Sequence, residues 1–169
     1  AGIKNNVLGF GLGIAMGDFN HDQWPDLYIS NDYNEQDYLY INNQDGTFSE
    51  QLENFMTHTS MFSMGSDAAD INNDGFLDLF TLDMLPEGDE RQKMVLGPDN
   101  YEKFQQLNQS GFYYQSMRNM LQLNQGGKFF TEIGQLAGVS NTDWSWAPLF
   151  ADFDNDGFKD LFITNGYKK

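Results

Sequence analysis

The feature that most constrains this chain is an acidic nine-residue loop that occurs three times, each time directly before a short apolar run. The pattern is Asp-x-(Asp/Asn)-x-Asp-x-x-x-Asp, at 18–26 (loop 1), 70–78 (loop 2) and 152–160 (loop 3). The apolar runs that follow the loops lie at 27–30, 79–82 and 161–164. Alternate side chains of a tight loop can point at one centre, so the repeated pattern predicts three related cation sites, each joined to a strand.

The predicted ligands are the side-chain oxygens at loop positions 1, 3, 5 and 9 and the backbone carbonyl at position 7. In chain order they are Asp18, Asn20, Asp22, Trp24 and Asp26, then Asp70, Asn72, Asp74, Phe76 and Asp78, then Asp152, Asp154, Asp156, Phe158 and Asp160. Position 6 is Gly75 or Gly157 in loops 2 and 3, which suits a turn with positive φ, but Gln23 in loop 1. A non-glycine residue in that conformation costs on the order of 1 kcal/mol. We therefore expect loop 1 to bind its cation more weakly, and loop 3, with four carboxylates, to bind most tightly.

Calcium is the predicted ion, with up to three bound. Magnesium demands a compact octahedron and keeps its waters, whereas five or six protein oxygens suit the larger ion. Zinc would need His or Cys ligands, but the chain has no Cys, and His21 lies at a loop position that is not a ligand. An EF-hand would need Glu at position 12, where this chain has Ile29, Thr81 and Ile163. The alternative is that these Asp, Asn and Gly clusters are simple turns, but a turn does not need Asp at position 9.

Composition narrows the possible partners. The net charge is −16, and the chain has no basic stripe, so we expect no nucleic-acid partner. The loops hold ten of the 25 acidic residues (three, three and four), and three divalent ions would bring the net charge to about −10 by adding six to −16.

The absence of Cys excludes disulfides and a Cys nucleophile. No apolar stretch is long enough for a membrane span. Because the chain starts and stops inside its repeat pattern, we expect it to be a fragment of a longer chain.

Repeated strand patterns surround the loops. The segments entering them, 10–17, 62–69 and 144–151, each begin with an aromatic residue and carry small residues at matched places, which predicts strands that pack closely around an axis. Third strands are predicted at 38–42 and 120–124, and fourth strands at 47–49 and 128–131 after hairpin turns. The expected fold is all-β: a partial β-propeller of about two and a half four-stranded antiparallel blades. Its predicted parts, within a single fragment 1–169, are blade 1 at 9–50, blade 2 at 61–132 and half of blade 3 at 144–165.

The second unit carries an insertion at about 86–118. Within it, residues 98–100 followed by 101–109 and closed by Gly111 predict a short capped helix. Insertions in repeat proteins often carry function, although this helix could instead cap a blade edge. The candidate ligand-binding residues, as a platform for sugar stacking, are Tyr101, Phe104, Tyr113 and Tyr114. For Trp24, Trp144 and Trp146 the favoured prediction is packing between sheets, with sugar stacking as the alternative.

These loops and strands resemble the FG-GAP/VCBS repeats of integrin-α-type β-propellers, and the resemblance covers essentially the whole chain. Phe10-Gly11 and Ala147-Pro148 echo the family's name in separate copies. More narrowly, the segments 83–86, 97–101, 117–124 and 141–167 are similar to bacterial proteins of the cartilage-acidic-protein (ASPIC/UnbV) type, although the C-terminal module of that type is not present here. The resemblance implies calcium-held blades, an extracellular, cell-surface or periplasmic location, and adhesion or carbohydrate binding.

Three functional hypotheses remain open. The main one is a calcium-binding propeller module for adhesion or ligand binding, whose partners are a glycan or protein ligand on the propeller face and the remaining blades of a longer parent chain. It predicts no catalytic residues and no enzyme activity. The second is part of a calcium-dependent polysaccharide lyase or glycoside hydrolase, in which Asp67 and Asp83 could form an acid–base pair, although solvation or extra cation coordination is the favoured role for both. The third is a purely structural propeller segment.

Overall fold

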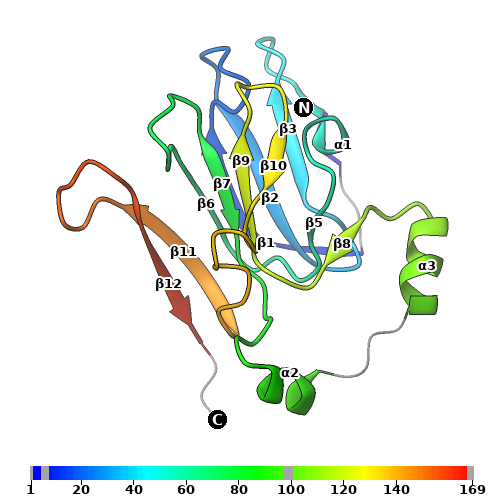
Figure 1. Ribbon diagram of the computed structural model, residues 1–169. Coiled ribbons are helices and arrows are strands. Elements are labelled where there is room, and N and C mark those ends of the chain that lie inside the picture. The colour runs from blue at the N-terminus through cyan, green and yellow to red at the C-terminus, as the bar shows by residue number, and fades with distance from the viewer. Residues whose placement is uncertain (1, 5–7, 97–100, 167–169) are drawn as a thin grey trace.

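The computed structural model describes residues 2–4, 8–96 and 101–166, and these residues confirm the all-β prediction. They form two four-stranded antiparallel sheets, a two-stranded antiparallel hairpin, a short parallel strand pair and three short helices. The sheets follow one another along the chain and stack side by side like blades (Figure 1). Because the third of them has only two strands, the arrangement is a partial propeller.

The first sheet has the strand order β1-β2-β3-β4 and is a simple meander. Its strands are β1 (Gly9–Gly17), β2 (Asp26–Tyr33), β3 (Tyr38–Asn42) and β4 (Phe48–Glu50). Loop 1 joins β1 to β2. A β-bulge between Gly11 and Gly13 interrupts the β1–β2 register. Each strand overlaps the segment in which the sequence predicts it.

The second sheet repeats this arrangement with the order β6-β7-β9-β10. Its strands are β6 (Ser66–Ala69), β7 (Asp78–Thr81), β9 (Met120–Asn124) and β10 (Phe130–Glu132). All four residues of β7 are buried, because this sheet lies between the other two and is covered on both faces. The third sheet is the hairpin of β11 (Ser145–Ala151) and β12 (Asp160–Asn165), joined by loop 3.

Small residues at matched repeat positions let the first strands of the three sheets approach closely, as predicted. A Cβ atom on Gly13 would lie 3.0 Å from Gly65 Cα, and one on Gly65 would lie 2.4 Å from the carbonyl oxygen of Trp146. The contacts β1–β6 and β6–β11 therefore join backbone to backbone, with no room for a larger side chain at these two positions.

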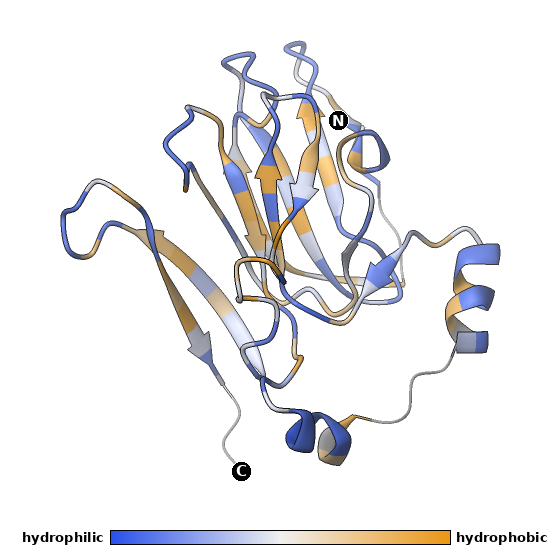
Figure 2. Ribbon diagram, in the orientation of Figure 1, coloured by the Kyte–Doolittle hydropathy of each residue, from blue (hydrophilic) through white to orange (hydrophobic). Residues whose placement is uncertain are grey.

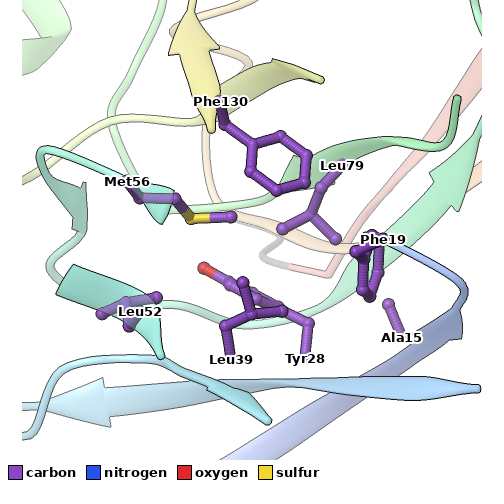
Figure 3. Close-up of a cluster of buried hydrophobic side chains, with 8 residues drawn as sticks. All are labelled: Ala15, Phe19, Tyr28, Leu39, Leu52, Met56, Leu79 and Phe130. Carbon is purple, nitrogen blue, oxygen red and sulfur yellow. The ribbon is translucent and has the colours of Figure 1, made fainter. Parts of the chain in front are cut away.

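Two apolar clusters fill the spaces between neighbouring sheets. The cluster between the first and second sheets is drawn in Figure 3 and consists of Ala15, Phe19, Tyr28, Leu39, Leu52, Met56, Leu79 and Phe130. The second cluster lies between the second sheet and the hairpin. It joins Phe80, Leu82 and Leu121 to Phe150, Leu161 and Ile163 of the hairpin. Figure 2 shows hydrophobic residues interspersed with hydrophilic ones along the strands of the sheets, and mostly hydrophilic residues in the acidic loops at their ends.

The insertion contains α2 (Asp89–Val95), α3 (Tyr101–Gln109) and β8 (Gln115–Ser116). The predicted helix at 101–109 is confirmed as α3, whereas its predicted capping segment, 98–100, lies outside the described residues. Strand β8 pairs in parallel with β5 (Thr59–Ser60), and a short helix α1 (Leu52–Phe55) follows the first sheet. Helix α3 stands away from the sheets in Figure 1.

The insertion connects the first sheet to the segment that leads into the third sheet. At one end the Arg91 guanidinium lies 2.7 Å from the Asp143 carboxylate, just before β11. At the other, Gln115 donates its amide to the Glu35 carbonyl, in the turn between β2 and β3, at 3.2 Å. The insertion thus contacts both the first sheet and the segment leading into the third, which the sequence pattern does not predict.

Candidate metal centre

The three acidic loops share one backbone conformation. Position 4 has positive φ in each, at 61° for His21, 58° for Asn73 and 60° for Asn155. Position 6 also has positive φ, at 73° for Gln23 and 91° for both glycines that replace it in loops 2 and 3. Loop 1 therefore adopts the same turn as the others despite lacking glycine, as expected, and it bears the conformational cost at Gln23.

The same hydrogen bonds organise each loop around its first carboxylate. The position 1 carboxylate accepts the N–H groups of positions 5 and 6, and the position 5 carboxylate accepts the N–H of position 7. In loop 3, Asp152 accepts from Asp156 at 3.1 Å and from Gly157 at 3.0 Å, while Asp156 accepts from Phe158 at 2.8 Å. The equivalent distances lie between 2.7 and 3.0 Å in loops 1 and 2. These bonds draw the acidic side chains of each loop toward its own backbone.

Loop 3 gathers the largest group of carboxylates. Asp152, Asp154 and Asp156 each place a carboxylate oxygen within 4.8 Å of the other two. In loops 1 and 2 an amide replaces the middle carboxylate, and Asn20 and Asn72 donate to Asp22 and Asp74 at 3.0 and 2.9 Å. The Asn20 amide is the main cause that holds the pKa of Asp22 below its ordinary value. The side chains at positions 1, 3 and 5 all offer hard oxygen atoms as metal ligands, and calcium prefers ligands of this kind.

The position 9 aspartates connect each loop to its sheet. Asp26 and Asp78 are fully buried, and burial raises the pKa of each. One oxygen of each accepts the N–H of loop position 2, at 2.9 and 3.0 Å. The other accepts the N–H of Asn42 or Asn124, at 2.9 and 2.8 Å. Asp160 keeps the first contact, from the Phe153 N–H at 2.9 Å, but is exposed and lies outside the compact group of loop 3.

Sequence reasoning missed Asn42 and Asn124, which end β3 and β9. The available signal was that both third strands end in Asn at the matched repeat position. The residues predicted to offer position 7 carbonyls, Trp24, Phe76 and Phe158, all lie at the same turn of their loops, each with its N–H bound to the position 5 carboxylate.

The predicted ligand-binding aromatic residues divide into two groups. Tyr101, Phe104 and Tyr114 are exposed, whereas Tyr113 is half-buried against the first apolar cluster and donates its hydroxyl to the Met56 carbonyl at 2.5 Å. Tyr113 therefore anchors the insertion, and the other three side chains face solvent. The three Trp side chains retain 37–47% exposure, so sheet packing covers only part of each.

The structure gives Asp67 and Asp83 separate contacts. Asp83 is fully buried, and burial raises its pKa. Its carboxylate accepts hydrogen bonds from Ser60 Oγ, at 2.5 Å, and from the N–H groups of Met61 and Phe62. Asp67 accepts the Phe150 N–H at 2.7 Å. The prediction that Asp83 is a solvated surface residue is therefore wrong. Its carboxylate instead holds the segment that leads into the second sheet.

Comparison with protein families identifies the repeat. A family model described as FG-GAP-like repeat matches residues 11–81 and 110–163, which is most of the chain. The chain belongs to the FG-GAP-like repeat family. The unmatched residues between the two ranges include α2 and α3, so these helices are an addition to the FG-GAP-like repeats. Among curated proteins, none matches this chain. No helix in the described part of the chain has the length and apolar character needed to cross a bilayer.

Proposed function

We propose that this chain is a calcium-binding β-propeller module that binds an extracellular ligand or mediates adhesion. The observation that carries the calcium part is the compact group of Asp152, Asp154 and Asp156 on a loop whose backbone geometry occurs three times. Like charges at this spacing repel one another, and a divalent cation would remove that repulsion. The residues that would hold the ion are the side chains at positions 1, 3 and 5, with the position 7 carbonyl.

Calcium would act here as a structural ion. Each loop joins the first two strands of its sheet, so fixing the loop fixes their hairpin, and ion binding is coupled to folding. The ligand-binding part of the proposal is carried by the insertion, which adds exposed aromatic side chains to an otherwise repeated framework. Tyr101, Phe104 and Tyr114 offer flat apolar faces, which suit a sugar ring or an aromatic side chain of a protein partner. The proposed role is binding, at an extracellular, cell-surface or periplasmic site.

Thermal melting tests the calcium proposal. Melting the protein in excess chelator and in millimolar calcium should give a higher Tm with calcium, because only the folded loops gather the carboxylates. The double variant Asp152→Asn/Asp154→Asn should lose part of this increase. Asp45→Asn is the matched control, since Asp45 lies in a β-hairpin turn outside the loops, and it should keep the full increase. An unchanged Tm between chelator and calcium would overturn the proposal.

A further inference from the structure

Each acidic loop contacts the next acidic loop along the chain. Between loops 1 and 2, the rings of His21 and Phe76 pack with centroids 4.9 Å apart. Between loops 2 and 3, Asn73 donates its amide to the Gly157 carbonyl at 3.2 Å. Both contacts start from position 4, one of the two loop positions with positive φ, and end at position 6 or 7 of the following loop.

Asn124 adds a buried connection between loops 1 and 2. It is 2% exposed, and its N–H donates to Asp78 Oδ1 in loop 2 at 2.8 Å. Its side-chain amide donates to the Leu77 carbonyl in loop 2 at 3.1 Å and to the Phe19 carbonyl in loop 1 at 2.9 Å. The Phe19 N–H in turn donates to Asp26 of loop 1. A continuous chain of hydrogen bonds therefore runs from Asp26 through Phe19 and Asn124 to Asp78.

The matched residue in the first sheet shows which of these contacts is additional. Asn42 donates its N–H to Asp26 at 2.9 Å and its amide to the Pro25 carbonyl at 3.1 Å, and both of these partners lie in its own loop, loop 1. Asn124 makes the same two contacts with loop 2 and then a third with loop 1. The third contact is what makes Asn124 a bridge.

We propose that Asn124 couples the cation sites of loops 1 and 2, so that an ion in loop 2 raises the affinity of loop 1. This inference rests on the calcium binding proposed above. An ion in loop 2 fixes Leu77 and Asp78, which fixes the Asn124 side chain, and Asn124 then holds the Phe19 carbonyl. Loop 1 thus begins partly ordered and loses less conformational entropy when it binds. The benefit falls on the loop whose turn is strained at Gln23.

Trp24 provides a reporter that distinguishes loop 1 from the other two. It occupies position 7 of loop 1, whereas loops 2 and 3 have Phe at that position. Terbium replaces calcium at oxygen-rich sites and luminesces when a nearby Trp is excited. A terbium titration of the whole chain therefore follows loop 1 through the part of the signal that Trp24→Phe removes. Calcium competition in the same titration gives the calcium affinity.

The decisive comparison is between Asp74→Asn, which weakens loop 2, and Asp156→Asn, the matched change in loop 3. We expect Asp74→Asn to move the loop 1 midpoint to about fivefold higher terbium or more, the lower end of typical coupling between sites. Asp156→Asn should leave it unchanged, because loop 3 contacts Asn73 of loop 2, whereas the hydrogen bonds of Asn124 go to loops 1 and 2. In an Asn124→Ala background the effect of Asp74→Asn should disappear. The Asp74 and Asp156 variants keep Asn124, so they test coupling even if Asn124→Ala does not fold.

The outcomes separate this inference from the function on which it rests. A Trp24-dependent signal whose midpoint is the same in both Asp→Asn variants would overturn the coupling and leave cation binding intact. An effect of Asp74→Asn that persists in the Asn124→Ala background would overturn the role of Asn124. No Trp24-dependent signal in the parent chain would overturn cation binding at loop 1 itself.

Discussion

Single buried polar residues tie neighbouring sheets together, and Asp37 is one of them. Asp37 is fully buried between the first two sheets and accepts hydrogen bonds from Tyr28 Oη at 2.5 Å, the Asn31 N–H at 2.8 Å and Ser63 Oγ at 2.8 Å. Burial outweighs these bonds and raises its pKa from 3.8 to about 7. The matched residue in the second sheet is Asn119, which accepts the Asp83 N–H at 2.8 Å and donates to Thr142.

This raised pKa predicts a loss of stability as pH rises toward neutrality. The folded state holds the Asp37 proton more tightly than the unfolded chain, so its contribution is complete below about pH 4 and is lost as pH rises through about 7. Over pH 5 to 7 the free energy of unfolding should fall by about 2 kcal/mol from this group. Asp37→Asn should remove that fall, because an amide does not titrate in this pH range. The Asn side chain can still form hydrogen bonds with Tyr28 and Ser63, as Asn119 does with Thr142.

Urea unfolding at fixed saturating calcium, compared between the parent and Asp37→Asn at each pH, isolates this group from the other carboxylates. Parallel pH profiles for the two proteins would show that Asp37 titrates normally in the folded state.

At the scale of elements, different residues of the insertion attach it to the sheets and present aromatic side chains to solvent. Tyr113 anchors it through the Met56 carbonyl, and Tyr114 beside it is 57% exposed. We expect Tyr113→Phe to lower the free energy of unfolding by about 1 kcal/mol, the typical contribution of one hydrogen bond. Tyr114→Ala and Tyr101→Ala should leave stability within about 0.5 kcal/mol of the parent but abolish binding to whichever glycans the parent binds on an array. If both variants keep the parent's full binding profile, the insertion is not the ligand platform.

The elements that the sequence predicts are those that recur. Strands β2, β7 and β12 each follow an Asp loop, and the turn residues Gly75 and Gly157 mark the same geometry twice. Helix α3 is predictable because its start and its end at Gly111 carry local signals. The parallel pairing of β5 with β8 is not, because two-residue strands have no periodicity and the partners are far apart in the chain.

The site is predictable to a similar degree. The oxygen-rich pattern of the three loops and the cost at Gln23 follow from residue type and spacing along the chain. The use of position 9 to hold the third strand, and the bridge at Asn124, depend on contacts between loops and strands that spacing cannot reveal. For the same reason, one kind of residue can have two roles, as Tyr113 and Tyr114 show.

At the scale of the whole molecule, the two outer sheets leave apolar faces open. In the hairpin, Phe162 is 55% and Leu149 49% exposed, whereas the matched aromatic residues Tyr28 and Phe80 are 1% and 0% exposed in the other sheets. On the opposite side, β1 exposes Ile14 and Met16 at 68% and 69%. The stacking of the sheets explains this difference. A sheet face is buried where a neighbouring sheet packs on it, and the outer faces of the first and third sheets have no neighbouring sheet in the described chain.

These open faces and the net charge of −16 have opposite effects on association. Apolar patches favour self-association, whereas like charge keeps molecules apart. The calcium binding proposed above would reduce the net charge without covering the patches, so we expect the mean mass in solution to rise with protein concentration, and more steeply with calcium than with chelator. Light scattering after gel filtration measures this. Phe162→Asn should reduce the association and change the Tm little, because the ring contributes little to the core, whereas Phe80→Asn should unfold the chain. A mass that stays monomeric with calcium at all concentrations would show that charge and local packing suffice to shield both faces.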